Sequence, residues 1–289
     1  MADHYQTIHN NFKRLVAYGC SNTMGEELAD HLCLGISFDE CNKLKKKYGS
    51  VTQFEQSTWN GKKIADHMVE YDVLTKNWQL SYPGVLANLL GLDYDIRAET
   101  GNSQCHIYWQ LVHDFELGKI EPTDMLLIGC TLPPRYMIMQ NNKGKLFTEG
   151  RTIPLAQELF PEEAKSIAVL YSDEKFVWEY YNNLWLTKTF AETHKLTLMI
   201  VPTTIWDIDA DHPDWIYKDI HPLLKKYCKK VWQTLKESVM VTDQGLENFF
   251  ENPDKPNHAG WGHYPQHNHK AYAQHIYDRL ELFGNFIRI

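Results

Sequence analysis

Unbroken apolar runs that end abruptly in small and polar residues constrain the fold of this chain most strongly. The run at residues 14–19 leads into Cys20 and Ser21, and the runs at residues 124–130 (DMLLIGC) and 196–201 (LTLMIV) have the same character. Strands without polar–apolar alternation are typical of parallel sheets that are covered on both faces. Helical patterns separate these runs, so the sequence predicts an α/β protein with a central parallel sheet and helices on both faces.

The remaining elements are bounded by local start and stop signals. Glycines end several of the helical patterns, as glycine does at helix C-termini. The predicted elements are a further strand at residues 94–99 and helices at residues 81–90, 103–117, 173–194, 219–238 and 267–282. Two segments, about residues 35–77 and 133–172, do not fit this alternation. We expect them to be insertions over the carboxyl edge of the sheet, within a single domain that spans residues 1–289.

Charge and composition exclude several classes of function. The net charge of −8 argues against a nucleic-acid partner. The lysines at positions 43, 45, 46 and 47 are spaced as a solvated helix face. We see no signal-peptide core at the start and no run of 18 apolar residues, so we expect a cytoplasmic protein without membrane contact. The six cysteines lack paired short spacing and predict free thiols.

Candidate chemical groups stand at the ends of three predicted strands, at residues 19–21, 100–103 and 129–131. Because the carboxyl ends of parallel strands meet at one edge of a sheet, we expect these three segments to converge. Ser21 offers a hydroxyl beside the N-terminus of a helix, and Gly101 allows close approach of a backbone N–H group. The pattern therefore favours a nucleophile with oxyanion-stabilising donors around it.

The turn around Ser21 also has a purely structural interpretation. Thr23 and Glu26 have the spacing of a helix capping box, in which the two side chains satisfy free backbone N–H groups. The local sequence alone leaves both interpretations open.

A histidine-rich segment precedes the last predicted helix. His263 lies on the loop before that helix, from which it can reach the end of the first strand and act as a base. Five of the 14 histidines lie within residues 258–275, which suggests a metal site. Their spacing lacks the HExxH arrangement of a helical zinc site, so we expect no metal and no cofactor.

Together these blocks resemble the SGNH (GDSL-like) hydrolase family, in particular bacterial and phage members that open with a GCSxT-type serine block. The first block is YGCSNTMGEEL, at residues 18–28, and the resemblance extends from residue 14 to about residue 282. It implies a three-layer α/β/α sandwich of the flavodoxin-like kind, and a serine esterase or O-deacetylase acting on a small or carbohydrate-linked ester. Ser21 would be the nucleophile and His263 the base, with the backbone N–H groups of Ser21 and Gly101 as oxyanion donors.

Two positions depart from the family pattern. The third block normally supplies an asparagine where Thr131 stands, so Thr131 or Asn102 would complete the oxyanion hole. The family aspartate, three residues before the histidine, is replaced by Gly260, and the nearest upstream acid is Asp254. Arg135, just beyond the third strand, is a candidate contact for a substrate anion, with a structural salt bridge as the alternative.

These departures keep two other functions open. A catalytically weak or inactive protein of the same fold would use the carboxyl-edge cleft for binding, or serve as a structural component, of a virion if a phage encodes it. A metal-dependent hydrolase using the histidine cluster is the second alternative. The expected partner of the leading hypothesis is a small-molecule or carbohydrate ester, and the sequence does not set the oligomeric state.

Overall fold

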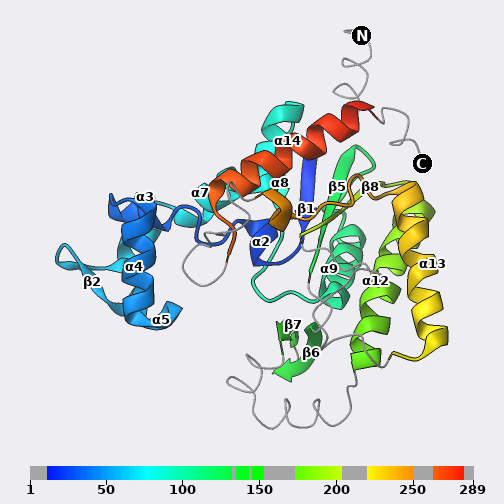
Figure 1. The fold of residues 1–289 in the computed structure, drawn as a ribbon, viewed down its shortest axis with the longest axis horizontal. Coiled ribbons are helices and arrows are strands. Elements are labelled where there is room, and N and C mark those ends of the chain that lie inside the picture. Colours follow the sequence, from blue (N-terminus) through cyan, green and yellow to red (C-terminus); the bar gives the residue numbers. More distant parts are fainter. Residues whose placement is uncertain are drawn as a thin grey trace.

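A four-stranded parallel sheet forms the centre of the molecule, with strand order β4-β1-β5-β8 (Figure 1). The computed structural model describes residues 12–131, 135–142, 145–152, 173–203, 220–249 and 263–282. The strands are β1 (Arg14–Tyr18), β4 (Asp93–Ile96), β5 (Asp124–Cys130) and β8 (Thr197–Pro202). β1, β5 and β8 lie at the three predicted apolar runs, and β4 overlaps the further strand predicted at residues 94–99. β1 and β5 occupy the two central positions.

Helices cover both faces of the sheet. Along β1, Leu15 and Ala17 pack into one core cluster and Val16 and Tyr18 into the other, because neighbouring side chains of a strand point to opposite faces. One face carries α8 (Tyr82–Leu90) and α14 (Gln266–Leu282). The other carries α9 (Gln104–Glu116), α12 (Asp173–Thr193) and α13 (Pro222–Ser238). The predicted three-layer α/β/α architecture is confirmed.

β4 ends earlier than predicted, at Ile96. Beyond this residue the chain still follows β1, because the N–H group of Glu99 donates to the carbonyl of Gly19 at 3.2 Å. The segment after β4 is thereby held at the carboxyl end of β1.

Local capping explains why the helices beside the sheet begin where the sequence predicted. The side chain of Ser81 accepts a hydrogen bond from the N–H group of Gly84 at the start of α8. Gly91 ends that helix in the left-handed conformation, with a φ of 66°. Ser103 caps α9 in the same way, by accepting from the N–H group of His106 at 3.1 Å.

The first predicted insertion, expected at about residues 35–77, is helical, covers residues 30–80 and has a small core of its own. Its elements are α3 (Asp30–Leu34), α4 (Phe38–Tyr48), α5 (Val51–Gln56), α6 (Ile64–Glu70) and α7 (Val73–Leu80), with an antiparallel pair β2 (Thr58–Trp59) and β3 (Lys62–Lys63). The core of this helical insertion consists of Leu34, Cys41, Phe54 and Ile64. In Figure 1, α3, α4 and α5 lie to one side of the sheet rather than within its helical layers.

The second predicted insertion contains an antiparallel hairpin, β6 (Arg135–Asn142) and β7 (Lys145–Thr152). A single turn of 3₁₀ helix, η1 (Leu246–Phe249), precedes the C-terminal helix. Among the helices that the structure describes, none is both long and apolar enough to cross a membrane.

Candidate functional site

Ser21 is the first residue of the short helix α2 (Ser21–Met24), directly beyond the carboxyl end of β1. Cys20 is the N-cap and makes no side-chain capping bond. Gly25 ends the helix with a φ of 77°, and its N–H group donates to the Ser21 carbonyl. The predicted capping box at Thr23 and Glu26 is therefore wrong, because Thr23 already lies inside this helix.

Thr23 instead anchors α2 to the sheet. Its side chain is fully buried and its hydroxyl shares a hydrogen bond with the Tyr82 hydroxyl at 3.2 Å. A Cβ atom on Gly19 would lie 2.1 Å from the Thr23 hydroxyl oxygen, and one on Gly129 would lie 2.2 Å from it. Glycine at the ends of β1 and β5 thus leaves the space into which Thr23 fits, and this packing fixes the position of Ser21.

Hydrogen bonds join the ends of the three strands that the sequence predicted to converge. The side-chain amide of Asn102 donates to the Gly19 carbonyl at 3.0 Å. The hydroxyl of Thr131 donates to the Asn102 carbonyl at 2.8 Å. Gly101, directly before Asn102, has a φ of 81°, a left-handed conformation that favours glycine. The ends of β4, β1 and β5 are therefore one connected unit.

These contacts bear on the two residues predicted to complete the oxyanion hole. The single hydroxyl proton of Thr131 and one amide proton of Asn102 are engaged with main-chain carbonyls, and both residues are buried. Donation to an oxyanion by either side chain stays a prediction, as does donation by the backbone N–H group of Gly101. What the geometry shows is that both side chains hold the Gly101 segment at the carboxyl ends of β1 and β5.

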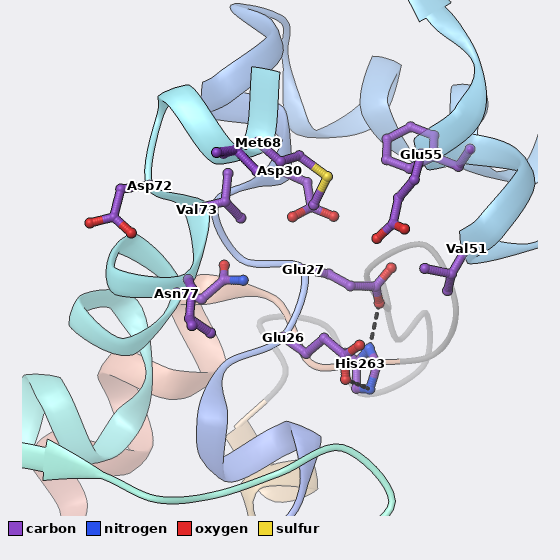
Figure 2. Close-up of a pocket in the computed structure, with 13 residues that line it drawn as sticks. Glu26, Glu27, Asp30, Val51, Glu55, Met68, Asp72, Val73, Asn77 and His263 are labelled. Atoms are coloured by element: carbon purple, nitrogen blue, oxygen red, sulfur yellow. Dashed lines mark hydrogen bonds and ion pairs between the residues drawn. The ribbon is translucent and has the colours of Figure 1, made fainter. Parts of the chain in front are cut away.

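His263 meets a carboxylate that the sequence analysis did not consider. Its Nδ1 atom lies 2.5 Å from Oε2 of Glu27, and Figure 2 shows the imidazole and this carboxylate facing each other. On the other side of the ring, Nε2 lies 3.6 Å from Oε2 of Glu26. When Nδ1–H donates to Glu27, the neutral ring has its lone pair on Nε2 and can accept a proton there.

The Glu27 carboxylate is buried and is held from a second direction by a lysine. Lys45 on α4 is 1% exposed, and its Nζ atom lies 2.7 Å from Oε1 of Glu27 and 2.8 Å from Oδ2 of Asp30. The predicted solvated face of the lysines at positions 43, 45, 46 and 47 is therefore wrong at Lys45. Burial of an ammonium group requires such carboxylate partners, and these two supply them.

Opposing effects set the ionisation of this buried cluster. Burial raises the pKa of Glu27, but the hydrogen bond from His263 and the charge of Lys45 outweigh it, so the pKa lies below its ordinary value. Burial lowers the pKa of Lys45, and the charges of Asp30 and Glu27 outweigh that effect and raise it. Glu27 and Lys45 are accordingly both charged at neutral pH, and the imidazole of His263 lies against a permanent carboxylate.

Another histidine near His263 has a structural role. His269 is buried on α14, and its Nδ1 atom accepts a hydrogen bond from the N–H group of Tyr82 at 3.1 Å. Burial and the neighbouring His263 lower its pKa to about 3. His269 is therefore neutral at physiological pH and ties α14 to α8.

The other predicted site residues are less fully described. Asp254, the expected acid, lies outside the described residues. Arg135 begins β6, and the structure describes its backbone but not its side chain. Cys20 is buried beside Ser21 as a free thiol. Within the described part of the chain, no group of three or more histidine, cysteine or acidic side chains is arranged to hold a metal ion.

Comparison with known proteins finds similarity to several solved structures. No protein-family model matches it, and no curated protein matches it. It is similar to a member of the lipolytic protein G-D-S-L family from Veillonella parvula, with 11% identity over 94% of this chain and 98% of that chain and a TM-score of 0.43. A GDSL-like lipase from Bacteroides thetaiotaomicron shares 10% identity over 97% of both chains, with a TM-score of 0.40.

A third similar structure is a carbohydrate esterase family 2 enzyme with a carbohydrate-binding domain, from Corynascus thermopiles. It shares 11% identity over 94% of this chain and 67% of that chain, with a TM-score of 0.46. Identities this low assign no role to any residue of this chain.

A signal for Glu27 was present in the sequence. Cys41 and Lys45 are four residues apart and share the buried face of α4, so a lysine stood on an apolar helix face. A buried lysine predicts a buried carboxylate partner. The pair Glu26 and Glu27, near the end of the serine block, was the nearest source of one.

Proposed function

We propose that this chain is a serine esterase in which Ser21, His263 and Glu27 form the catalytic triad. The observation that carries the proposal is the 2.5 Å contact between Nδ1 of His263 and the buried Glu27 carboxylate. Glu27 lies only six residues after Ser21, in the segment that directly follows α2. In serine hydrolases, an acid that accepts a hydrogen bond from Nδ1–H of the histidine holds the imidazole tautomer and stabilises the imidazolium that forms.

In the first half of the reaction, the Ser21 hydroxyl oxygen attacks the ester carbonyl carbon while Nε2 of His263 takes the hydroxyl proton. The tetrahedral oxyanion is stabilised by the backbone N–H groups of Ser21 and Gly101. The C–O bond to the alcohol then breaks, and His263 returns its proton to the departing alcohol oxygen. An acyl-enzyme on Ser21 remains.

In the second half, water attacks the acyl carbon and His263 takes one of its protons. Collapse of the second tetrahedral intermediate releases the carboxylic acid and returns the proton to the Ser21 oxygen. Glu27 stays ionised throughout, because Lys45 and the imidazolium both favour its charged form.

The substrate class follows from the family resemblance, which favours a small or carbohydrate-linked ester. Arg135 remains the candidate contact for an anionic group of that substrate. The expected acid Asp254 is not required in this scheme, because Glu27 takes the position on Nδ1 of His263.

Hydrolysis of p-nitrophenyl acetate by the wild type and by Ser21→Ala tests the proposal. We expect turnover in the wild type and its loss in the variant, with unchanged folding by circular dichroism. Ser238→Ala, which removes a hydroxyl at the far end of α13, is the matched control and should keep full activity.

A fluorophosphonate probe, which labels activated serines, gives an independent readout. Mass spectrometry should locate the label on Ser21 in the wild type and on no serine in the His263→Ala variant. Full activity of Ser21→Ala would refute the proposal. Absence of both labelling and turnover in the folded wild type would favour the binding or structural protein instead.

A further inference from the structure

A pocket of about 430 Å³ lies beside the His263–Glu27 pair, on the side of the helical insertion. Its walls come from α5, α6 and α7 and from the segment that follows α2. Ser21 does not line it, whereas His263 does. The pocket therefore adjoins the proposed catalytic base, and the nucleophile is not part of its lining.

The polar part of this pocket is almost entirely anionic. Five carboxylates line it, and His263 is the one basic side chain among the lining residues that the structure describes. The five are Glu26, Glu27, Asp30, Glu55 and Asp72. Figure 2 shows the carboxylates of Asp30, Glu27 and Glu55 directed into the same space. Lys45, which is not a lining residue, offsets part of the negative charge of Glu27 and Asp30. The lining side chains still carry a net negative charge.

Asp30 carries the clearest indication that a ligand completes this pocket. Its side chain is buried, with the residue only 4% exposed, and Oδ2 is bound to Lys45. Its other oxygen, Oδ1, is buried and has no hydrogen-bond partner among the described residues. Buried carboxylate oxygens in native proteins normally have a donor, so this acceptor lacks an N–H or O–H group.

Glu55, opposite Asp30, also lacks a partner in the part of the chain that the structure describes. It is half-buried on α5 and makes no hydrogen bond or ion pair with a described residue. Burial raises the pKa of its carboxyl, and the charges of Asp30 and Glu26 raise it further. A cation between Asp30 and Glu55 would relieve this repulsion.

Apolar side chains surround the anionic centre. Val69 is 80% exposed, Leu74 50% and Val51 42%, and all three line the pocket. Exposed apolar side chains gathered around a cavity are typical of a ligand-binding site. A ligand that matches this lining combines a positive charge with a short hydrocarbon segment.

We propose that this pocket binds the alcohol half of the substrate, and that this alcohol carries a primary ammonium group on a short apolar stem. The inference depends on the proposed function, because His263 is the group that protonates the departing alcohol and also lines the pocket. A primary ammonium donates N–H bonds, which Oδ1 of Asp30 and the Glu55 carboxylate can accept. A quaternary ammonium has no such donor, and an anionic alcohol would be repelled.

Calorimetric titration of the full chain, as the Ser21→Ala variant, measures this binding without turnover. The probe is 6-aminohexan-1-ol, compared with 1-hexanol, which has no charge, and with 6-hydroxyhexanoate, which has the opposite one. We expect the amino alcohol to bind about tenfold more tightly than 1-hexanol and the hydroxy acid not to bind. Equal affinity for the amino alcohol and 1-hexanol would overturn the proposal.

Variants identify the carboxylates responsible. Glu55→Gln should weaken binding of the amino alcohol about fivefold and leave 1-hexanol unaffected. Asp30→Asn should weaken it as well, and circular dichroism must show that this variant folds because Asp30 also binds Lys45. Asp39→Asn, an exposed acid on α4 outside the pocket, is the matched control. Unchanged binding in Glu55→Gln, or equal weakening in Asp39→Asn, would contradict the proposed site.

The two proposals fail in distinguishable ways. Tight binding of the amino alcohol by a protein without Ser21-dependent turnover would refute the esterase while keeping the cation pocket. Ser21-dependent turnover without selective binding of the amino alcohol would support the esterase and refute the cation pocket. If both hold, kcat/KM for 6-aminohexyl acetate should exceed that for hexyl acetate about tenfold, and Glu55→Gln should reduce that ratio.

Discussion

Replacing Lys45 with methionine removes the cation that two buried carboxylates share, and we expect this to be among the most destabilising single changes in the chain. Methionine keeps similar length and volume, so the loss is mainly electrostatic. Removal of one partner from a buried ion pair costs about 3–5 kcal/mol, because the other partner is left charged and without water. Against a total stability of about 5–15 kcal/mol, this corresponds to a melting temperature lower by roughly 6–20 °C.

The pH dependence of this loss distinguishes an electrostatic cause from a packing cause. In the wild type the pKa of Glu27 lies below its ordinary value of 4.5. Its contribution to stability is therefore present above pH 4.5 and disappears as the pH falls through the folded-state pKa. Without Lys45, the buried Glu27 carboxylate lies beside a second acid and has no lysine to balance its charge, so its pKa rises and it binds a proton at mildly acidic pH. The cost of Lys45→Met should thus be largest near pH 8 and smaller near pH 5.

Urea denaturation of both proteins at pH 8 and pH 5 measures these free energies of unfolding directly. Lys46→Met is the matched control, since Lys46 is the exposed neighbour on the same helix and should have almost no effect at either pH. A loss below about 1 kcal/mol for Lys45→Met would refute the buried ion cluster. An equal loss at both pH values would show that packing, rather than charge, explains the change.

Two further predictions concern the histidines near the site. Glu27→Gln removes the negative charge that faces Nδ1 of His263 and should lower kcat for p-nitrophenyl acetate about 100-fold or more, with partial recovery in Glu27→Asp. An unchanged kcat would remove Glu27 from the triad. His269 has a pKa of about 3 in the folded protein against 6.5 unfolded, so its contribution to stability is present above pH 6.5 and declines as the pH falls. Wild-type protein should therefore lose about 2 kcal/mol more than His269→Gln between pH 6.5 and pH 5, and parallel losses in urea titrations would contradict a buried neutral imidazole.

Much of the fold could be predicted because its determinants are local. The strand at residues 124–130 was predicted with the bounds of β5, since a continuous apolar run between polar residues has few other interpretations. Helix α8 begins after the predicted Ser81 and ends at Gly91, which are capping signals within a few residues of the helix itself. The convergence of the three strand ends could be predicted because the carboxyl ends of parallel strands lie at the same edge of a sheet, so no particular side-chain contact had to be known.

The acid on His263 could not be found by the same means. The resemblance to SGNH hydrolases places the acid three residues before the histidine, so it was expected close to His263 in sequence. The contact instead joins residues 236 positions apart. Glu27 also has a φ of 72°, a left-handed conformation that a non-glycine residue seldom adopts and that no local pattern at this position indicates. Its side-chain direction is thus set by tertiary contacts.

The position of Lys45 changes how the helical insertion has to be understood. As a lid, the insertion would cover a site that is complete without it. Lys45 instead comes from α4, within the insertion, and provides the charge beside which the Glu27 carboxylate can remain ionised while buried. Because an unpaired carboxylate at this depth would bind a proton or turn toward water, the Glu27–His263 contact and the docking of α4 stabilise each other. The insertion also provides the walls of the anionic pocket, so one segment both maintains the proposed acid and shapes the space beside the proposed base.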